Sequence, residues 1–369
     1  MESLISPVDG VQVHGSTLLP RRSGILLAAW FAGPHEGHPQ TGVQVLRRGV
    51  WDTGTVPVSR DTGDGSCCPT LALTTWDTGT VPVSHVRSSV TPILPGDGVA
   101  HWNPVLTEGP DGEVWLFFKR GHRIDQWTTW VCRSSDEGLT WSSPVELVPG
   151  DASGGRGPTR QAPVSRDGLW LAPGSIEQWE PPAWDCFIDV SADGGARWEQ
   201  VMLPLDHEVV AGAGCIQPCL LEVGDELVVL ARSTAGRVYR SATRDPFTWP
   251  ALTPTDLPNN NSGLAAVVLP DGRIACLHND ASGEWGARSR LVLSVSADAG
   301  LTWETVSTIV EGVAGAADGT PQAAAATGIV TTGEGEYSYP AMVLFDDRLW
   351  ATYSSERRSI ALVKLELPS

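Results

Sequence analysis

Six segments of the chain share one order of polar and apolar positions. Each begins with a short polar cluster and continues through an apolar stretch, a turn and a second apolar stretch such as ILLAAWFAG or EVWLFFKRG. Short apolar runs bounded by Gly, Asp and Pro predict buried β-strands. The clusters begin at His14, His101, Arg160, Ile216, Asn261 and Tyr337. Six copies of one unit predict six similar sheets.

A second repeat is a turn with the pattern S-x-D-x-G-x-x-W. Full copies occupy residues 134–141, 191–198 and 296–303, and a degenerate copy runs from Ser241 to Trp249. The Asp carboxylate can accept hydrogen bonds from turn amides, Gly supplies a positive φ, and Trp can pack the hairpin onto neighbouring strands. The copies start roughly 50 to 57 residues apart, which suits a four-stranded propeller blade with its loops.

The two repeats together predict an all-β fold, a single six-bladed β-propeller spanning residues 1–369. The last strand, near SIALVKLEL, is expected to pair with N-terminal residues and close the ring. The nonapeptide WDTGTVPVS occurs at 51–59 and again at 76–84. This duplication is placed in a surface loop of the first blade, where insertions are tolerated, with a functional lid as the alternative.

Composition narrows the possible partners. The chain has 43 acidic and 25 basic residues and a formal charge of −18, which disfavours nucleic acids and anionic membrane surfaces. The N-terminal segment has neither a basic region nor a long apolar run, so a cytoplasmic chain is expected. The spacing of the seven Cys matches no zinc or redox motif, and reduced buried thiols with no metal and no cofactor are expected. The oligomeric state stays open.

In a propeller the polar ends of the inner strands meet at one mouth, so the polar clusters are the candidate site. Cationic side chains at this mouth would bind a small acidic sugar, because guanidinium groups pair with carboxylates. Candidate acid and base groups are His14, Glu36 and Glu177. Histidine titrates near neutral pH, and glutamate also serves as a general acid or base. Candidate binding residues are Lys119, Arg160, Arg232, Arg288, Asn103, His101, Gln217 and Asn261.

The S-x-D-x-G-x-x-W turn resembles the Asp-box, or BNR repeat, of the sialidase-like superfamily. The segments ILLAAWFAGPHEG, NPVLTEGPDGEVWLFFK, NNNSGLAAVVLPDGR and GEYSYPA also resemble that group, over nearly the whole chain. Sialidases hold the substrate carboxylate with three arginines and use a Tyr nucleophile, a Glu partner and an Asp acid/base. By this resemblance Arg232 and Arg288 match the second and third arginines, and Tyr337 matches the nucleophile.

The sequence departs from the sialidase pattern at three positions. His14-Gly15-Ser16 stands in place of the first arginine, and Gln217 stands in place of the Glu partner. The stretch 34–40, where the acid/base Asp is expected, contains no Asp. A neutral Gln cannot accept a proton from a Tyr nucleophile.

Three functions therefore compete. The first is an exo-glycosidase on an acidic sugar, with Tyr337 as the nucleophile and Glu36 or Glu177 as the acid/base. The second is a uronate lyase, in which Arg neutralises the carboxylate and Tyr337 or His14 removes the proton beside it. The third is a non-hydrolytic tailoring enzyme for small molecules, or a sugar-binding propeller. The nature of the product distinguishes them.

Overall fold

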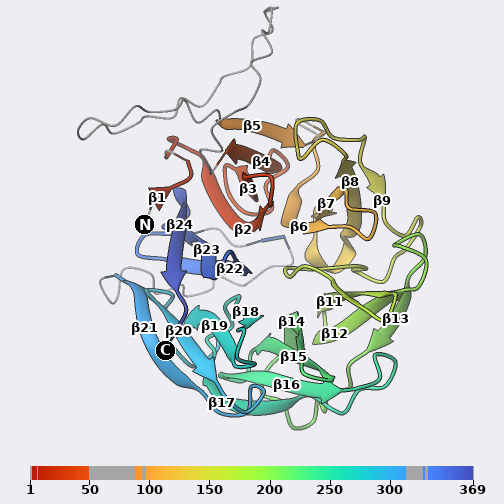
Figure 1. Cartoon of the computed structure of the whole chain (residues 1–369), viewed down its shortest axis with the longest axis vertical. Coiled ribbons are helices and arrows are strands. Elements are labelled where there is room, and N and C mark those ends of the chain that lie inside the picture. Colours follow the sequence, from red (N-terminus) through yellow and green to blue (C-terminus); the bar gives the residue numbers. More distant parts are fainter. Residues whose placement is uncertain are drawn as a thin grey trace, which may run out of the picture.

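The computed structural model describes residues 2–5, 7–49, 88–93, 97–312, 327–328 and 331–368. Six antiparallel four-stranded sheets stand as blades around a ring (Figure 1). The duplicated nonapeptide lies between β4 and β5, outside the described residues. Within them no helix is long or apolar enough to span a membrane.

The blades follow one another along the chain. Blade 1 consists of β2 (Gln12–Pro20), β3 (Ile25–Gly33), β4 (Gly42–Gly49) and β5 (Ser88–Ile93). Blade 2 consists of β6 (His101–Glu108), β7 (Val114–Arg120), β8 (Thr128–Ser134) and β9 (Val145–Glu146), with the 3₁₀ turn η1 (Ile124–Gln126) before β8. Blade 3 consists of β10 (Val164–Arg166), β11 (Leu169–Trp179), β12 (Pro182–Ser191) and β13 (Glu199–Met202).

The second half of the ring repeats this order. Blade 4 consists of β14 (Cys215–Val223), β15 (Glu226–Ser233), β16 (Arg237–Thr243) and β17 (Thr253–Pro258). Blade 5 consists of β18 (Ala265–Val268), β19 (Ile274–Asn279), β20 (Arg290–Ser296) and β21 (Glu304–Glu311). Blade 6 combines β22 (Tyr337–Phe345), β23 (Arg348–Ser355) and β24 (Ser359–Glu366) with β1 (Glu2–Ser3).

The two ends of the chain close the ring as predicted. Strand β1 pairs with β24, with Glu2 opposite Leu362 and Ser3 opposite Ala361. Leu4 and Ile5 follow this strand into the hydrophobic core shared by blades 1 and 6. Closure removes two exposed sheet edges and buries apolar surface in the same step.

The innermost strands carry β-bulges at the polar clusters. The pairing register shifts between His14 and Thr17 in β2, and equivalent shifts occur in β6, β14 and β22. Each bulge holds one residue with positive φ, and these are Gly15, Asn103, Gln217 and Tyr339. A bulge re-aims a side chain, and the Pro that follows Asn103, Gln217 or Tyr339 has no amide hydrogen to leave unpaired.

The S-x-D-x-G-x-x-W turns form the hydrogen bonds that their sequence predicts. In the turn between β20 and β21, the Asp298 carboxylate accepts the amides of Leu301 and Thr302 at 3.1 and 2.9 Å. It also accepts the hydroxyl of Ser296. The indole of Trp303 donates to the carbonyl of Gly300 at 3.1 Å. The turn is therefore stabilised by its own side chains.

These bonds make Asp298 a pH-dependent contributor to stability. Slight burial opposes ionisation, but hydrogen bonds from Thr302 and Ser296 outweigh it and lower the pKa of Asp298 to about 2. Its contribution is present above the unfolded pKa of about 4 and is lost as the pH falls through about 2. We expect Asp298→Asn to lower the thermal midpoint at pH 7 and to weaken its dependence on pH between 4 and 2. The exposed Asp9→Asn is the control, and equal midpoints for both variants would contradict this assignment.

Candidate functional site

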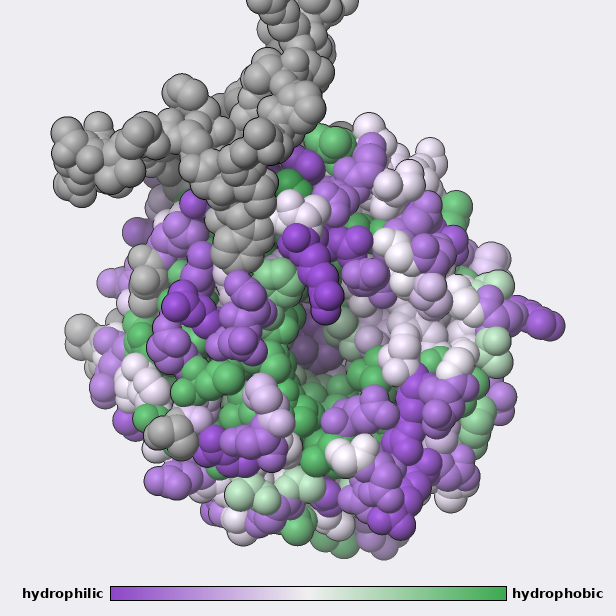
Figure 2. Space-filling model, viewed as in Figure 1, coloured by the Kyte–Doolittle hydropathy of each residue, from purple (hydrophilic) through white to green (hydrophobic). Residues whose placement is uncertain are grey.

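A cavity at the centre of the ring is enclosed by residues from several blades. Figure 2 shows that the face of the molecule is hollowed near this centre. The polar lining comprises Glu36, Asn103, Glu177, Gln217, Arg232 and Tyr339. The apolar lining comprises Trp102, Ile124, Trp127, Trp179, Trp184 and Trp285. Two carboxyl groups, one guanidinium group, one phenol and two amides thus meet beside a tryptophan-rich wall.

Tyr339 is the centre of the polar side. Its bulge in β22 holds the backbone at φ 52°, a conformation that costs a non-glycine residue about 1–3 kcal/mol. The Arg232 guanidinium donates a hydrogen bond to the phenol oxygen at 2.8 Å. The guanidinium carbons of Arg160, Arg232 and Arg288 lie 5.0, 5.7 and 5.5 Å from the centre of the Tyr339 ring. Three guanidinium groups therefore surround the Tyr339 ring.

Arg232 is fixed by neutral groups. Its Nη1 also donates to the Gln217 amide oxygen at 3.0 Å, and its Nε and Nη2 donate to the Asn261 amide oxygen at 3.0 and 2.8 Å. Gln217 and Asn261 carry no charge that could neutralise the guanidinium. The side chain is nevertheless buried with 3% of its surface exposed.

Arg160 occupies the space beside the first-blade cluster. A Cβ on Gly15 would lie 2.7 Å from the Phe31 ring, so the cluster beside Arg160 requires glycine at this position. Arg160 donates to the backbone carbonyls of Ser16, Tyr339 and Pro340 at 3.3, 3.2 and 2.9 Å. Burial lowers its pKa to about 10, which leaves it protonated at neutral pH.

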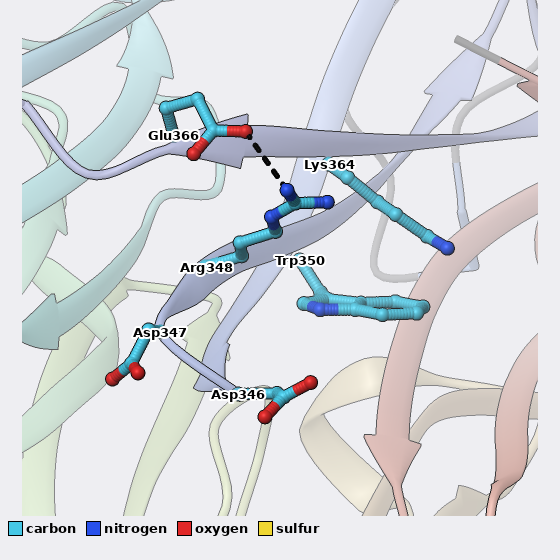
Figure 3. A pocket seen from close by; sticks show the side chains of 6 residues that line it. All are labelled: Asp346, Asp347, Arg348, Trp350, Lys364 and Glu366. Atoms are coloured by element: carbon cyan, nitrogen blue, oxygen red, sulfur yellow. Dashed lines mark ion pairs between the residues drawn. The ribbon is translucent and has the colours of Figure 1, made fainter. Parts of the chain in front are cut away.

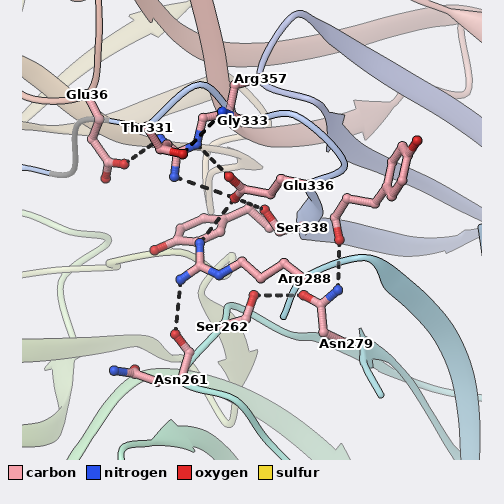
Figure 4. Close-up of polar contacts among 12 residues, drawn as sticks. Glu36, Asn261, Ser262, Asn279, Arg288, Thr331, Gly333, Glu336, Ser338 and Arg357 are labelled. Carbon is pink, nitrogen blue, oxygen red and sulfur yellow. Dashed lines mark hydrogen bonds and ion pairs between the residues drawn. The ribbon is translucent and has the colours of Figure 1, made fainter. Parts of the chain in front are cut away.

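A second set of charges lies behind Tyr339 and is paired. Arg288 bonds Glu336 at 3.2 Å, and Arg357 bonds both Glu336 and Glu36 at 2.8 Å (Figure 4). Ser338 also donates to Glu336. Arg357 and Arg288 hold the pKa of Glu336 far below its usual range, although burial opposes this. The cavity carboxylate Glu36 is therefore tied to Arg288 through two intervening side chains.

His14 lies against Tyr339 without a hydrogen bond. The two ring centres are 4.2 Å apart, and His14 has no exposed surface. Neither of its ring nitrogens has a hydrogen-bond partner among the described residues. Burial, then the charge of Arg357, lowers its pKa well below the usual value. His14 is therefore neutral and supports the ring of Tyr339 by packing.

The two cavity carboxyl groups have different environments. Burial raises the pKa of Glu177 to about 7, and the charge of Glu36 acts in the same direction. Glu36 is bonded to Arg357. Two acidic groups in one cavity, one protonated near pH 7 and one paired with a guanidinium, can serve opposite roles in proton transfer.

The sequence-predicted residues divide into those that line the cavity and those that do not. Glu36, Glu177, Asn103, Gln217 and Arg232 line it. Arg160, Arg288, Asn261 and His14 lie directly behind the lining, around Tyr339 and Arg232.

Tyr337, the sequence-predicted nucleophile, lies outside the cavity. Tyr339 lines the cavity instead. The Tyr337 ring packs in the core beside Tyr353, with ring centres 6.4 Å apart, and its carbonyl accepts a bond from Asn279. Both tyrosines stand in the same cluster, YSYP, and the bulge after Ser338 decides which of them faces the axis.

Lys119 and His101 are also absent from the cavity lining. The fully buried ammonium of Lys119 donates to Thr129 and to the carbonyl of Arg156, both at 2.7 Å. The His101 ring bonds the Asp97 carboxylate at 3.0 Å. Both side chains are buried, and their polar groups bond residues outside the cavity lining.

Sequence reasoning missed the aromatic wall and the paired charges. Five tryptophans line the cavity, and the indole nitrogens of Trp127, Trp179 and Trp184 are buried without an acceptor in the described structure. Glu336 and Arg357 carry no motif, because their pairing joins the residue before β22 to the turn between β23 and β24, two places that are far apart in the sequence. The aromatic wall could have been suspected from Trp102, which stands inside a polar cluster.

A second cavity lies at the end of the β22–β23 hairpin and contains none of the predicted residues. It is lined by Asp346, Asp347, Arg348, Trp350, Lys364 and Glu366 (Figure 3). Arg348 pairs with Glu366 at 3.4 Å, and the Lys364 ammonium lies 3.9 Å from the centre of the Trp350 ring. Across the described chain, no group of three or more His, Cys, Asp or Glu is arranged to hold a metal ion.

Six four-stranded blades around one cavity define the chain as a six-bladed β-propeller. A BNR repeat-like domain matches residues 24–350, and the chain belongs to this family. No curated protein matches the chain.

Solved structures share the fold. The Hadza microbial sialidase Hz136 superimposes with a TM-score of 0.64 at 14% identity, over 96% of this chain and 66% of that one. The NanB sialidase from Streptococcus pneumoniae gives 0.62 at 10% identity, over 99% and 70%. A protein of unknown function from Dyadobacter fermentans gives 0.65 at 12% identity, over 100% and 99%. Identities this low establish the fold alone, so the activity has to be argued from the cavity.

The strained bulges predict an unusual response to mutation. Asn103 lines the cavity with φ 42°, which glycine adopts freely and alanine does not. We expect Asn103→Gly to be more stable than Asn103→Ala by about 1 kcal/mol. Urea unfolding of both variants measures this difference. Alanine equal to or better than glycine would show that this backbone position is unstrained.

Proposed function

We propose that this protein is a glycoside hydrolase that removes a terminal, carboxylate-bearing sugar, with Tyr339 as its nucleophile. The observation that carries this proposal is the charge balance around Tyr339. Four buried arginines surround it or lie behind it, and two glutamates, Glu36 and Glu336, pair with two of them. Arg160 and Arg232 have no carboxylate within ion-pair distance among the described residues.

An uncompensated buried charge is costly, so this site favours an anion. Arg232 is the one of these two that lines the cavity, and because four of its five N–H groups already bond Asn261, Gln217 and Tyr339, it attracts a carboxylate chiefly through its charge. The tryptophan wall opposite supplies flat apolar surface for the carbon face of a sugar ring. An acidic sugar matches both sides of the cavity.

The cavity residues can carry out a double displacement. The Tyr339 oxygen attacks the anomeric carbon as Glu36 takes the phenolic proton, and Glu177 protonates the departing glycosidic oxygen. Arg232 stabilises the charge that develops on the phenol oxygen. In the second step, ionised Glu177 takes a proton from water, which attacks the anomeric carbon. The carbon–oxygen bond to Tyr339 breaks, and Glu36 returns the proton.

Elimination from a uronate is the second candidate, and the neutral Gln217 favours it. With no carboxylate at that position, Tyr339 held by Arg232 can instead act as a base that removes the proton beside the substrate carboxylate. Glu177 again protonates the leaving oxygen. The product then carries a double bond and no added water.

Incubation with α-sialosides and uronosides, followed by mass spectrometry and ultraviolet absorbance, tests these proposals. A product that has gained water supports hydrolysis, whereas an unsaturated product that absorbs ultraviolet light supports elimination. Silence across the panel would count against both and would favour a binding propeller or a tailoring enzyme for other small molecules.

The two neighbouring tyrosines provide a matched pair for mutation. We expect Tyr339→Phe to lower kcat by about a thousandfold or more, because the nucleophile is lost. Tyr337→Phe, which removes a hydroxyl outside the cavity, should stay within about threefold of wild type. Steady-state kinetics on the best substrate measures both variants. The reverse order would return the nucleophile to Tyr337.

Glu177 predicts the alkaline limb of the pH profile. Because its pKa is raised to about 7, kcat/KM should fall as the pH rises through 7 and the acid is lost. Glu177→Gln should remove this limb and lower kcat by roughly 10²–10⁴-fold. A substrate with a nitrophenol leaving group, which needs little protonation, should recover most of the rate. An unchanged limb in the variant would exclude Glu177 as the acid.

The ionisation of Glu177 should also change the free energy of unfolding, which can be measured without a substrate. The folded protein holds the Glu177 proton more tightly than the unfolded chain, so the free energy of unfolding falls as the pH rises from about 4 through 7. Glu177→Gln should flatten this part of the dependence.

A further inference from the structure

Arg357 connects the cavity to the charges behind Tyr339. It follows β23 in the turn before β24, far from Glu36 in the sequence. Its Nη1 donates to Glu36 at 2.8 Å, and its Nε donates to Glu336 at 2.8 Å. The guanidinium has 1% of its surface exposed. Figure 4 shows Arg357 standing between the two carboxylates.

The backbone around Arg357 is built to hold it there. The carbonyl of Arg357 accepts the amide of Val13 at 2.8 Å, which joins the turn to β2 of blade 1. A Cβ on Gly333 would lie 2.8 Å from the Arg357 Cβ, so this position requires glycine. Glu336 is itself held by Arg288 and Ser338. The guanidinium therefore has one location, set by blades 1, 5 and 6.

Glu36 depends on this guanidinium for its placement. It lies in the loop between β3 and β4, where Gly37 packs so closely that a Cβ would lie 2.7 Å from the Trp102 ring. Among the described residues, Arg357 is the hydrogen-bond donor to the Glu36 carboxylate, and it binds one oxygen. The other oxygen can receive a proton from a group in the cavity.

We infer that Arg357 is a positioning residue for the reaction, acting through Glu36. It holds one oxygen of that buried carboxylate and leaves the other oxygen to the cavity. The inference rests on the proposed function, in which Glu36 exchanges the proton of Tyr339. Arg357 belongs to no sequence motif, so this role was not predicted. The pair of Arg288 and Glu336 is buried because Glu336 also holds Arg357.

The charged groups that face Arg357 act together. Glu36 and Glu336 favour its charge, whereas His14, Arg288 and Arg160 are the other ionisable groups gathered around this pair. His14 is neutral, so changes at Arg357 reach the cavity mainly through Glu36. Glu336 keeps its second partner, Arg288, when Arg357 is removed.

The test compares Arg357→Met, Arg357→Lys and Arg240→Met; Arg240 is a partly buried residue of blade 4 whose guanidinium bonds the Ala299 carbonyl of blade 5. We expect Arg357→Met to lower kcat by about a hundredfold with KM changed less than about threefold. Arg357→Lys should recover at least tenfold of that loss, and Arg240→Met should resemble wild type. The acid limb of the kcat/KM profile should move to higher pH in Arg357→Met, because the carboxylate loses its cation.

A double-mutant cycle with Glu36→Gln separates positioning from general structural support. If Arg357 acts through Glu36, Arg357→Met should cost less than about threefold in kcat when Glu36 is already Gln. Independent losses that multiply would overturn the inference, as would an unmoved acid limb. Should Arg357→Met fail to fold, Arg357→Lys with Glu36→Gln completes the same cycle.

A stability cycle keeps the two proposals distinguishable. Thermal midpoints of Arg357→Lys, Glu36→Gln and the double variant need no substrate. Suppose that the midpoints are coupled but the protein turns over no substrate. This result would refute the proposed function and still support the interaction between Arg357 and Glu36. An active enzyme whose midpoints and rates show no coupling would refute only the role of Arg357 in positioning Glu36.

Discussion

The buried guanidinium groups around Tyr339 impose the constraint on which the centre of this propeller depends. A guanidinium can be buried only if its five hydrogen-bond donors find acceptors and its charge finds compensation. Arg288 and Arg357 meet both demands with Glu336 and Glu36. Arg160 and Arg232 bond carbonyl and amide oxygens, but the Arg160 Nε has no acceptor and neither guanidinium has a carboxylate within ion-pair distance among the described residues. The charge that remains is the best physical guide to the ligand.

The ring provides the geometry that such a site needs. Bulges in the inner strands turn one residue of a blade toward the axis, and Asn103, Gln217 and Tyr339 reach the cavity in this way. Their left-handed backbone is strained, and it persists because the packed sheets behind it fix the chain on both sides. Rigid blades thus carry the polar groups, while Gly15 in the first blade avoids a clash with the Phe31 ring.

The fold could be predicted from the sequence because each of its signals is local. Alternating polar clusters and apolar strands gave six blades, the turn motif gave their spacing, and the terminal strands gave closure through Leu362 and Ala361. The site was predicted in part. Glu36, Glu177 and Arg232 were found because propeller geometry brings strand ends and loops to one mouth. Tyr339 was missed because a bulge, rather than simple alternation, decides between it and Tyr337. Arg357 and Glu336 were missed because they pair with each other across blade 6 and with Glu36 and Arg288 of other blades, and such contacts leave no sequence motif.

Arg232 lines the cavity with no carboxylate within ion-pair distance in the described structure, and we expect its charge to select a carboxylate ligand. Titration calorimetry of acids and their esters measures this selectivity. Glucuronic acid and sialic acid would each be titrated into wild type and Arg232→Met beside their methyl esters, which keep the ring and lose the charge. We expect at least one acid to bind wild type about tenfold or more tightly than its ester does, and Arg232→Met to abolish this difference. Equal binding of every acid and its ester by wild type would contradict it.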